Sequence, residues 1–218
     1  MRATIVIRHR PALGLLAFVL LFAAGCGLSE YEKAMDVERK RIDDFDLQNK
    51  YLGDPIRITQ ERKGEAKKDK KEVSLPPARL SVRPPKEVTS KRGTEGSLLQ
   101  VYDAGTGAEM MATFQKLYIG VAVDMKQADF RNAVLGPFRI SGSAQPGDVN
   151  IQSPNGTVKR FQMLHSEVQA PMGTATLSIY FYDQAPYQAA LIFKVLKSKA
   201  TSDTDKAIEL CLRSLTLG

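Results

Sequence analysis

Residues that commonly carry chemistry are scarce in this chain. Among its 218 residues it has no tryptophan, two histidines and two cysteines. A zinc site needs three or four nitrogen, sulfur or oxygen ligands in one place, and the spacing of Cys26, His165 and Cys211 suggests none. The stretch DAGTGAE lacks the glycine spacing and the Lys-Ser/Thr pair of a phosphate-binding loop. We therefore expect no metal and no cofactor.

The net charge of +7 is not spread evenly along the chain. Residues 1–25 carry three arginines, residues 26–60 carry six basic against eight acidic side chains, and residues 61–92 carry eleven against five. Residues 93–218 hold eleven of each and are neutral. A nucleic-acid-binding domain normally has a basic face on its folded part, so we expect no nucleic-acid partner.

Residues 1–25 have the pattern of a cleaved signal peptide. Arg2, Arg8 and Arg10 form a positive start, and residues 13–24 are a purely apolar run of twelve. A membrane-spanning helix needs about 20 apolar residues, whereas a short apolar run that ends in small residues is typical of an export signal. The alternatives are an uncleaved signal anchor and an ordinary secretory signal that happens to precede a cysteine.

The end of this run, Ala23-Ala24-Gly25-Cys26, resembles the lipobox of bacterial lipoproteins, with alanine in place of the usual leucine at its first position. The resemblance implies that Cys26 is lipidated and becomes the new N-terminus. It also implies an exported, membrane-anchored protein on the periplasmic or outer face of a bacterial envelope. More than one acyl chain gives durable anchoring. Cys211 then has no disulfide partner, and we expect it to be buried on a helix face.

Residues 26–54 are expected to form a juxtamembrane amphipathic helix. Ser29 and Glu32 fit a capping box, and Gly53-Asp54-Pro55 supplies a stop. A spacing of this kind also occurs in coiled coils, so residues 28–52 could join several copies. Two polar positions in fewer than four heptads favour a spacer, or a helix packed on its own domain, instead. The seam positions alternate in steps of three and four: Leu28, Tyr31, Met35, Glu38, Ile42, Phe45, Asn49 and Leu52.

Residues 55–77 have the composition of a basic disordered linker. They are rich in charge and nearly free of aromatic side chains, so they bury too little apolar surface to offset the entropy of ordering them. The alternation of Leu80 and Val82 in ARLSVRPPKEV predicts the first strand of a folded domain that follows.

Residues 78–218 are expected to form an α+β domain, an antiparallel sheet with its helices packed on one face. Strands are predicted at SLLQVYDAG, TFQKLYIGVAVD, GTATLSIYFYD and YQAALIFKVLK. DVNIQSPNGTVKRFQMLHSEVQA is predicted to be a hairpin that turns at Asn155-Gly156. One helix is predicted at QADFRNAVLGPF, and a second, capped at Ser202 with Asp205 three residues on, closes the chain.

Two resemblances follow from these elements. The element order and the closing AIELCLRSL helix look like the PsbP-like fold of photosystem extrinsic proteins, over roughly residues 78–218. The front half, YEKAMDVERKRIDDFDLQNKYLGDP followed by RPPK, resembles uncharacterised planctomycete-type lipoproteins. The first implies a fold and the second an envelope location, and neither implies an activity.

No catalytic residue is expected. His165 and Ser166 are adjacent on a predicted strand, so their side chains point to opposite faces and form no nucleophile–base pair. We expect His165 to be an ordinary residue of the sheet. An enzyme would instead need carboxylates that are scattered in the sequence to meet in one deep pocket, from among Asp103, Glu109, Asp124 and Asp183.

Three tyrosines are expected on the outer face of the sheet. Tyr180, Tyr182 and Tyr187 would form an aromatic surface there, a kind of surface that suits partner binding. These observations favour a lipid-anchored, non-enzymatic binding or assembly module with an envelope protein as its partner. The alternative is an envelope hydrolase with carboxylate acid and base groups.

Overall fold

The structure is a computed structural model that describes residues 12–65, 72–96, 98–108, 111–141, 145–154 and 156–218. For residues 12–27, 61–65, 72–76 and 78 it describes the backbone alone. The chain divides into two compact units, Met1–Phe45 and Asp46–Gly218. Glu109, one of the four carboxylates considered above, lies outside the described residues.

Helix α1 (Ala12–Tyr51) begins well before Ser29, so the predicted helix start at that residue is wrong. Residues 12–24 are mostly leucine, alanine and phenylalanine, which favour a helix, and Gly25 and Gly27 do not interrupt it before Ser29. The helix ends close to the predicted stop, because Gly53 and Pro55 do not continue it. No helix among the described residues has a stretch that is long and apolar enough to cross a membrane.

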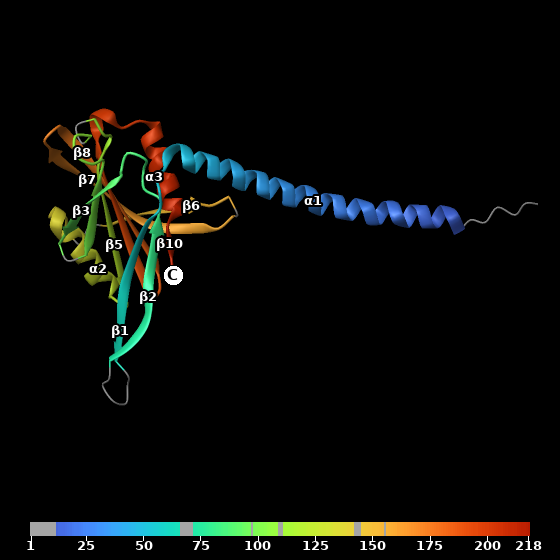
Figure 1. The fold of residues 1–218 in the computed structure, drawn as a ribbon, viewed down its shortest axis with the longest axis horizontal. Helices are drawn as coiled ribbons and strands as arrows, with labels where there is room; N and C mark the ends of the chain where they lie inside the picture. The colour runs from blue at the N-terminus through green and yellow to red at the C-terminus, as the bar shows by residue number, and fades with distance from the viewer. Residues whose placement is uncertain (1–11, 66–71, 97, 109–110, 142–144, 155) are drawn as a thin grey trace, which may run out of the picture. The chain divides into compact units, whose positions relative to one another are not determined.

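The unit Asp46–Gly218 contains a seven-stranded sheet in the order β3-β4-β5-β9-β8-β7-β6 (Figure 1), and every neighbouring pair is antiparallel. The predicted strands and hairpin are confirmed, and one strand that was not predicted, β3, forms an edge. The strands are β3 (Ser90–Glu95), β4 (Leu99–Asp103), β5 (Phe114–Val123), β6 (Gly147–Gln152), β7 (Val158–Ala170), β8 (Gly173–Gln184) and β9 (Tyr187–Leu196).

Both faces of this sheet are covered, which corrects the prediction that the helices share one face. Helix α2 (Gln127–Leu135) packs Phe130 and Val134 into one core, and α3 (Ser202–Ser214) packs its apolar side into another. The cause is visible in β9, where consecutive residues from Gln188 to Phe193 are all buried. A strand that is buried on both faces reads as a continuous apolar run instead of an alternating one.

The predicted disorder of residues 55–77 is wrong where the structure describes the chain. β1 (Ile56–Glu65) pairs with β2 (Glu72–Val82), and β2 also pairs with β10 (Thr216–Leu217), which makes a second sheet. Residues 66–71 lie outside the described part. Ile58 and Leu80 pair directly and are both buried, so a few apolar residues at one end anchor an otherwise charged hairpin.

The two shorter helices of the domain differ little from expectation. α2 stops at Gly136-Pro137, where a 3-10 turn (Gly136–Phe138) follows. A second 3-10 turn (Lys197–Lys199) precedes α3. The N-cap of α3 is Thr201 and not the predicted Ser202, and the Thr201 backbone N–H donates to Thr204 Oγ1 at 3.0 Å.

Candidate functional site at the end of α1

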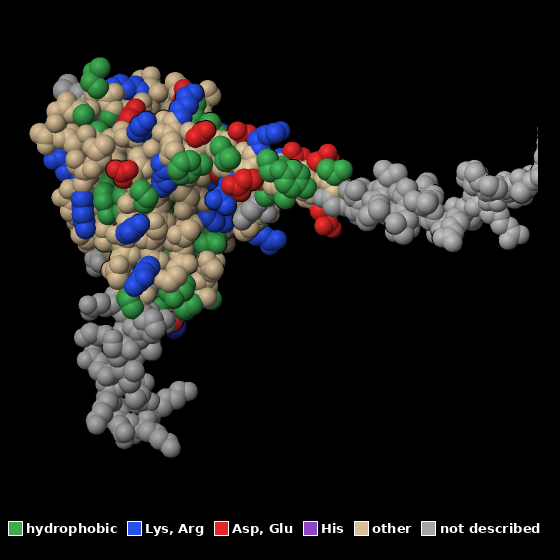
Figure 2. Space-filling view, turned by 45° about the vertical axis from the view of Figure 1, so that its right-hand side comes forward, with side chains coloured by type: hydrophobic (Ala, Val, Ile, Leu, Met, Phe, Trp, Pro, Cys, Tyr) green, Lys and Arg blue, Asp and Glu red, His purple; other side chains and the backbone are tan. Residues whose placement is uncertain are grey.

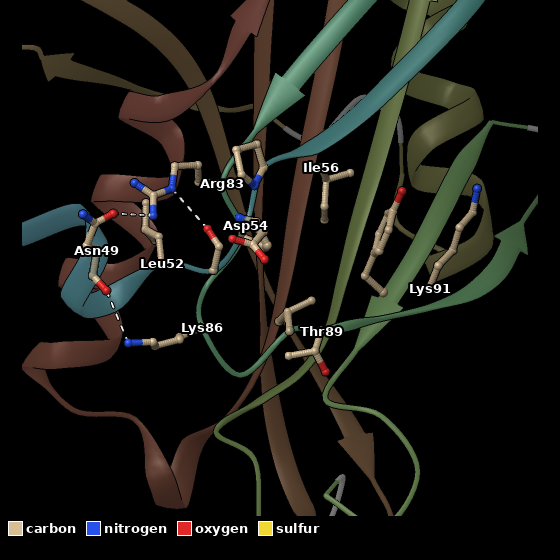
Figure 3. Close-up of a pocket in the computed structure, with 13 residues that line it drawn as sticks. Asn49, Leu52, Asp54, Ile56, Arg83, Lys86, Thr89 and Lys91 are labelled. Atoms are coloured by element: carbon tan, nitrogen blue, oxygen red, sulfur yellow. Dashed lines mark hydrogen bonds between the residues drawn. The ribbon is translucent and has the colours of Figure 1, made fainter. Parts of the chain in front are cut away.

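A cavity of about 700 Å³ lies where α1 ends, beside the segment between β2 and β3 (Figure 3). Its wall comes from three stretches of chain: the last turn of α1, the start of β1, and residues 83–91, with Tyr102 of β4. All these residues belong to the unit Asp46–Gly218. The labelled residues in Figure 3 are Asn49, Leu52, Asp54, Ile56, Arg83, Lys86, Thr89 and Lys91.

The first side of the cavity is the C-terminal end of α1, whose last carbonyl groups lack partners within the helix. Arg83 binds beside these carbonyls: its Nε donates to the carbonyl of Gly53, just past the helix, at 3.1 Å, and its Nη2 donates to the Asn49 side chain, at Oδ1, at 2.8 Å. Lys86 Nζ donates to the Asn49 carbonyl at 3.3 Å. Two cations therefore lie at the negative end of the helix dipole, where positive charge is stabilising.

Backbone hydrogen bonds fix the same junction. The Lys86 N–H donates to the Tyr51 carbonyl at 2.9 Å, and the Gly53 N–H donates to the Pro84 carbonyl at 2.9 Å. Leu52 is only 2% exposed and belongs to the core that contains α3. The last turn of α1 is thus part of the folded domain, which no local sequence signal at residues 49–53 indicates.

The floor of the cavity is apolar and its outer rim is charged. Val88 and Tyr102 are buried, and burial raises the pKa of the Tyr102 hydroxyl, which donates to Gln100 Oε1 at 2.8 Å. Lys91 stands on β3, across the cavity from Arg83 and Lys86 in Figure 3. Among the described residues, neither the side chain of Lys91 nor that of Asp54 has a hydrogen bond or an ion pair, so both charges are available to a ligand.

This arrangement suits binding and offers little for catalysis. The described lining has three cationic side chains against one carboxylate and contains neither histidine nor cysteine. Cationic rims recognise carboxylates and phosphates, and apolar floors take apolar side chains. The described residues contain no cluster of three or more side chains that could hold a metal ion.

The three predicted surface tyrosines do share one face, as the register of β8 with β9 requires. That face is the one covered by α3, however, and Tyr180 is only 8% exposed and packs against Phe161 and Phe193. Tyr180 is therefore not a surface residue. Tyr182 and Tyr187 are half-buried, and their role in partner binding stays a prediction.

His165 is an exposed residue of β7, as expected, and its Nδ1 lies 3.2 Å from Ser178 Oγ on the neighbouring strand β8. Sequence reasoning did not identify Ser178, because the contact depends on strand register. The carboxylate next on that face of the strand, Glu167, is paired with Lys197. The contact is therefore a cross-strand pair, and no third group among the described side chains has a hydrogen bond to the histidine that would orient it as a catalytic base needs.

Of the carboxylates named for an enzyme, the three that the structure describes do not gather in one pocket. Asp103 is buried and paired with Arg92 Nε at 2.5 Å, at the end of β4. Asp183 accepts a hydrogen bond from Gln127 Nε2 at 2.6 Å and lines a cavity of about 450 Å³ with Asp148. Asp124, exposed at the end of β5, is not among the residues that line this cavity.

The predicted lipidation site, Cys26, falls within α1, and its side chain is outside those described. Cys211 is completely buried on α3, as expected. Burial raises the pKa of its thiol.

Comparisons with known proteins give little. No family model matches the chain, and no curated protein matches it. A solved structure from Bacteroides thetaiotaomicron VPI-5482 is similar at 12% identity with a TM-score of 0.43, and the match covers 64% of this chain. The chain spans 45% of that protein's length. The lipoprotein and PsbP-like resemblances therefore stay predictions.

Proposed function

We propose that the chain is an exported bacterial lipoprotein, anchored through Cys26, whose domain is a non-enzymatic binding module of the envelope. The observation that carries this proposal is the junction Ala23-Ala24-Gly25-Cys26, which ends a twelve-residue apolar run. Helix α1 continues from Cys26 to Tyr51, and its end is held in the domain by Arg83 and Lys86. A helix that joins the domain in this way suits a spacer between an anchor and a binding surface.

The binding surface in this proposal is the cavity at the end of α1. Its free charges are Lys91 and Asp54, and its net charge is positive because Arg83 and Lys86 add to Lys91. A partner segment with acidic side chains and at least one apolar side chain fits this chemistry. An envelope protein that presents such a segment is the partner that we propose.

The hydrolase alternative has weaker support. It requires acid and base carboxylates together, and of the four carboxylates first considered, only Asp183 lines the cavity beside β6 to β8 in the described residues. Its neighbour there, Asp148, lies on an edge strand.

Replacing Cys26 with serine tests the anchor. The wild-type protein is expected to incorporate labelled palmitate and to sediment with membranes, and the Cys26→Ser variant is expected to do neither. Cys211→Ser is the matched control, because its thiol is buried and its loss leaves the lipidation signal intact. Equal labelling of wild type and Cys26→Ser would remove the basis of the proposal.

A photo-crosslinking amino acid placed at Lys91 tests the binding surface in intact cells. The control position is Lys126, an exposed lysine before α2, which packs on the opposite face of the sheet. We expect a discrete adduct from position 91 that is absent from position 126 and is lost when Asp54 and Lys86 are both replaced with alanine. Identical adduct patterns from the two positions would contradict the proposed surface.

A further inference from the structure

An apolar seam on α1 is exposed along its length. We define the seam as Leu28, Tyr31, Met35, Ile42 and Phe45, whose exposed fractions range from 47% to 62%. Figure 2 shows hydrophobic side chains of this helix at the surface among its acidic and basic ones. These five large apolar side chains lie on one face of the helix, at steps of three, four, seven and three, with Glu38 interrupting the stripe at the step of seven. A helix that served only as a soluble spacer would not require its apolar side chains to lie on one face.

We propose that the seam is the contact between two copies of this chain, which pair as parallel helices. In heptad terms Leu28, Met35 and Ile42 occupy position a, and Tyr31 and Phe45 occupy position d. Parallel orientation follows from the proposed function, because copies anchored at Cys26 in one membrane all start from the same side. This part of the inference rests on the lipid anchor.

Charges at the flanking positions agree with a parallel pair. Glu38 takes the remaining d position, where it packs beside position e of the second copy, and position e is Arg39. Arg41 at position g faces position e of the following heptad, which is Asp46. Within one copy, Arg41 Nη1 also lies 3.5 Å from Glu38 Oε2. The negative charge that interrupts the seam is therefore paired with a positive charge of the same helix.

The size of the seam indicates an interaction that depends on confinement. Five half-exposed side chains from each copy would bury about 1,000 Å² in all, just below the 1,200 Å² at which stable interfaces begin. Copies confined to one membrane meet at a high effective concentration, which raises the occupancy of a weak contact without new interactions. We therefore expect pairing on the membrane and largely monomeric protein when Cys26 is absent.

Disulfide crosslinking between differently tagged copies tests the seam in the full-length protein. Ile42→Cys places a thiol at position a, and Val37→Cys is the matched control at position c, because the two side chains are 53% and 57% exposed. After mild oxidation of isolated membranes, we expect the doubly tagged dimer to form at least tenfold faster for Ile42→Cys than for Val37→Cys. Cys211 does not interfere, because it is buried.

A second variant separates the seam from chance collision. Adding Phe45→Asp to Ile42→Cys places a carboxylate in the contact, and we expect the crosslinking rate to fall to that of Val37→Cys. Equal rates for Ile42→Cys and Val37→Cys, or adducts with another protein only, would overturn the second copy as the occupant. Fractionation of the same samples separates the two failures: protein outside the membrane fraction contradicts the anchor, and equal rates within the membrane fraction contradict the seam.

Discussion

Arg83 shows that the end of α1 in the candidate site depends on a single side chain that is distant in the sequence. It lies 34 residues after Asn49 and 30 after Gly53, and it binds both. A planar guanidinium can reach two acceptors at once, which a lysine ammonium on a flexible chain does less well. Gly53 and Pro55 predict where α1 stops. Nothing in the sequence near residues 49–53 indicates that Arg83 is the residue that binds this end of the helix.

Replacing Arg83 with alanine is expected to destabilise the domain by about 1–3 kcal/mol, because the Gly53 carbonyl and the Asn49 side chain lose their donor in a half-buried site. Urea unfolding followed by circular dichroism measures the change, since the chain has no tryptophan to report it. The control is Arg57→Ala, an exposed arginine whose side chain has no hydrogen bond or ion pair among the described residues, and we expect a change below about 0.5 kcal/mol.

Tyr180 predicts how stability depends on alkaline pH. Burial, with a smaller contribution from Asp205, raises the pKa of Tyr180 from 10.0 to about 12. The unfolded chain therefore loses this proton first, so stability is intact below pH 10 and falls as the pH rises toward 12. Tyr180→Phe is expected to match wild type at pH 7 and to exceed it by about 1–2 kcal/mol at pH 11.5.

Thermal unfolding between pH 7 and 11.5 measures this difference. Tyr31→Phe is the control, because Tyr31 is 62% exposed and its loss should leave the pH dependence unchanged. If Tyr180→Phe and wild type lost stability in parallel above pH 10, Tyr180 would not be the group responsible.

At the scale of elements, the strands and helices that could be predicted from the sequence are those whose buried residues recur at a regular spacing. β8 and α2 were predictable because period-2 and helical spacing are clear in GTATLSIYFYD and QADFRNAVL. β3, β1 and the first half of β2 were not, because SKRGTE and QERKGE read as solvated charge, whereas Leu80 and Val82 did predict the end of β2. Edge strands of this kind form by pairing with a neighbouring strand, and their charged side chains oppose pairing of the exposed edge with another chain. The location of the cavity at the end of α1 was unpredictable for the same reason, because the unpredicted strand β1 contributes Ile56 to its wall.

Lys159 fixes the end of α3 in the way that Arg83 fixes the end of α1. Its ammonium on β7 donates to the carbonyls of Arg213 and Leu215, and burial together with the nearby Arg213 lowers the pKa of Lys159. Lys159→Met keeps the methylene packing and removes both donors. We expect a loss of about 1–2 kcal/mol by urea unfolding, against almost no change for Lys126→Met on an exposed position. If Lys159→Met left the free energy of unfolding unchanged, water would be satisfying those carbonyls equally well.

At the scale of the whole molecule, the division of the chain after Phe45 predicts what can be removed. A fragment that begins at Asp46 keeps Asn49 and Leu52 in the domain and is expected to unfold within about 0.5 kcal/mol of the longer chain. A fragment that begins at Pro55 loses the buried Leu52 and the partners of Arg83, and we expect a loss of at least about 3 kcal/mol.

Denaturation midpoints of the two fragments test this expectation. Leu52→Ala in the fragment that begins at Asp46 is the matched control, because it removes the buried side chain while the backbone contacts stay. Its midpoint is expected to fall between those of the two fragments. Equal midpoints for the two fragments would show that the end of α1 contributes nothing to the domain.

The position of β9 in the sheet also sets the order in which the domain can be completed. β9 lies between β5 and β8, although it is the last long strand to be synthesised, and Thr216 then returns to Ser81, 135 residues earlier. Until these residues are made, β5 and β8 lack their shared neighbour, and pairing over such separations is slow. A nascent chain with this topology cannot complete the seven-stranded sheet until β9 has been synthesised.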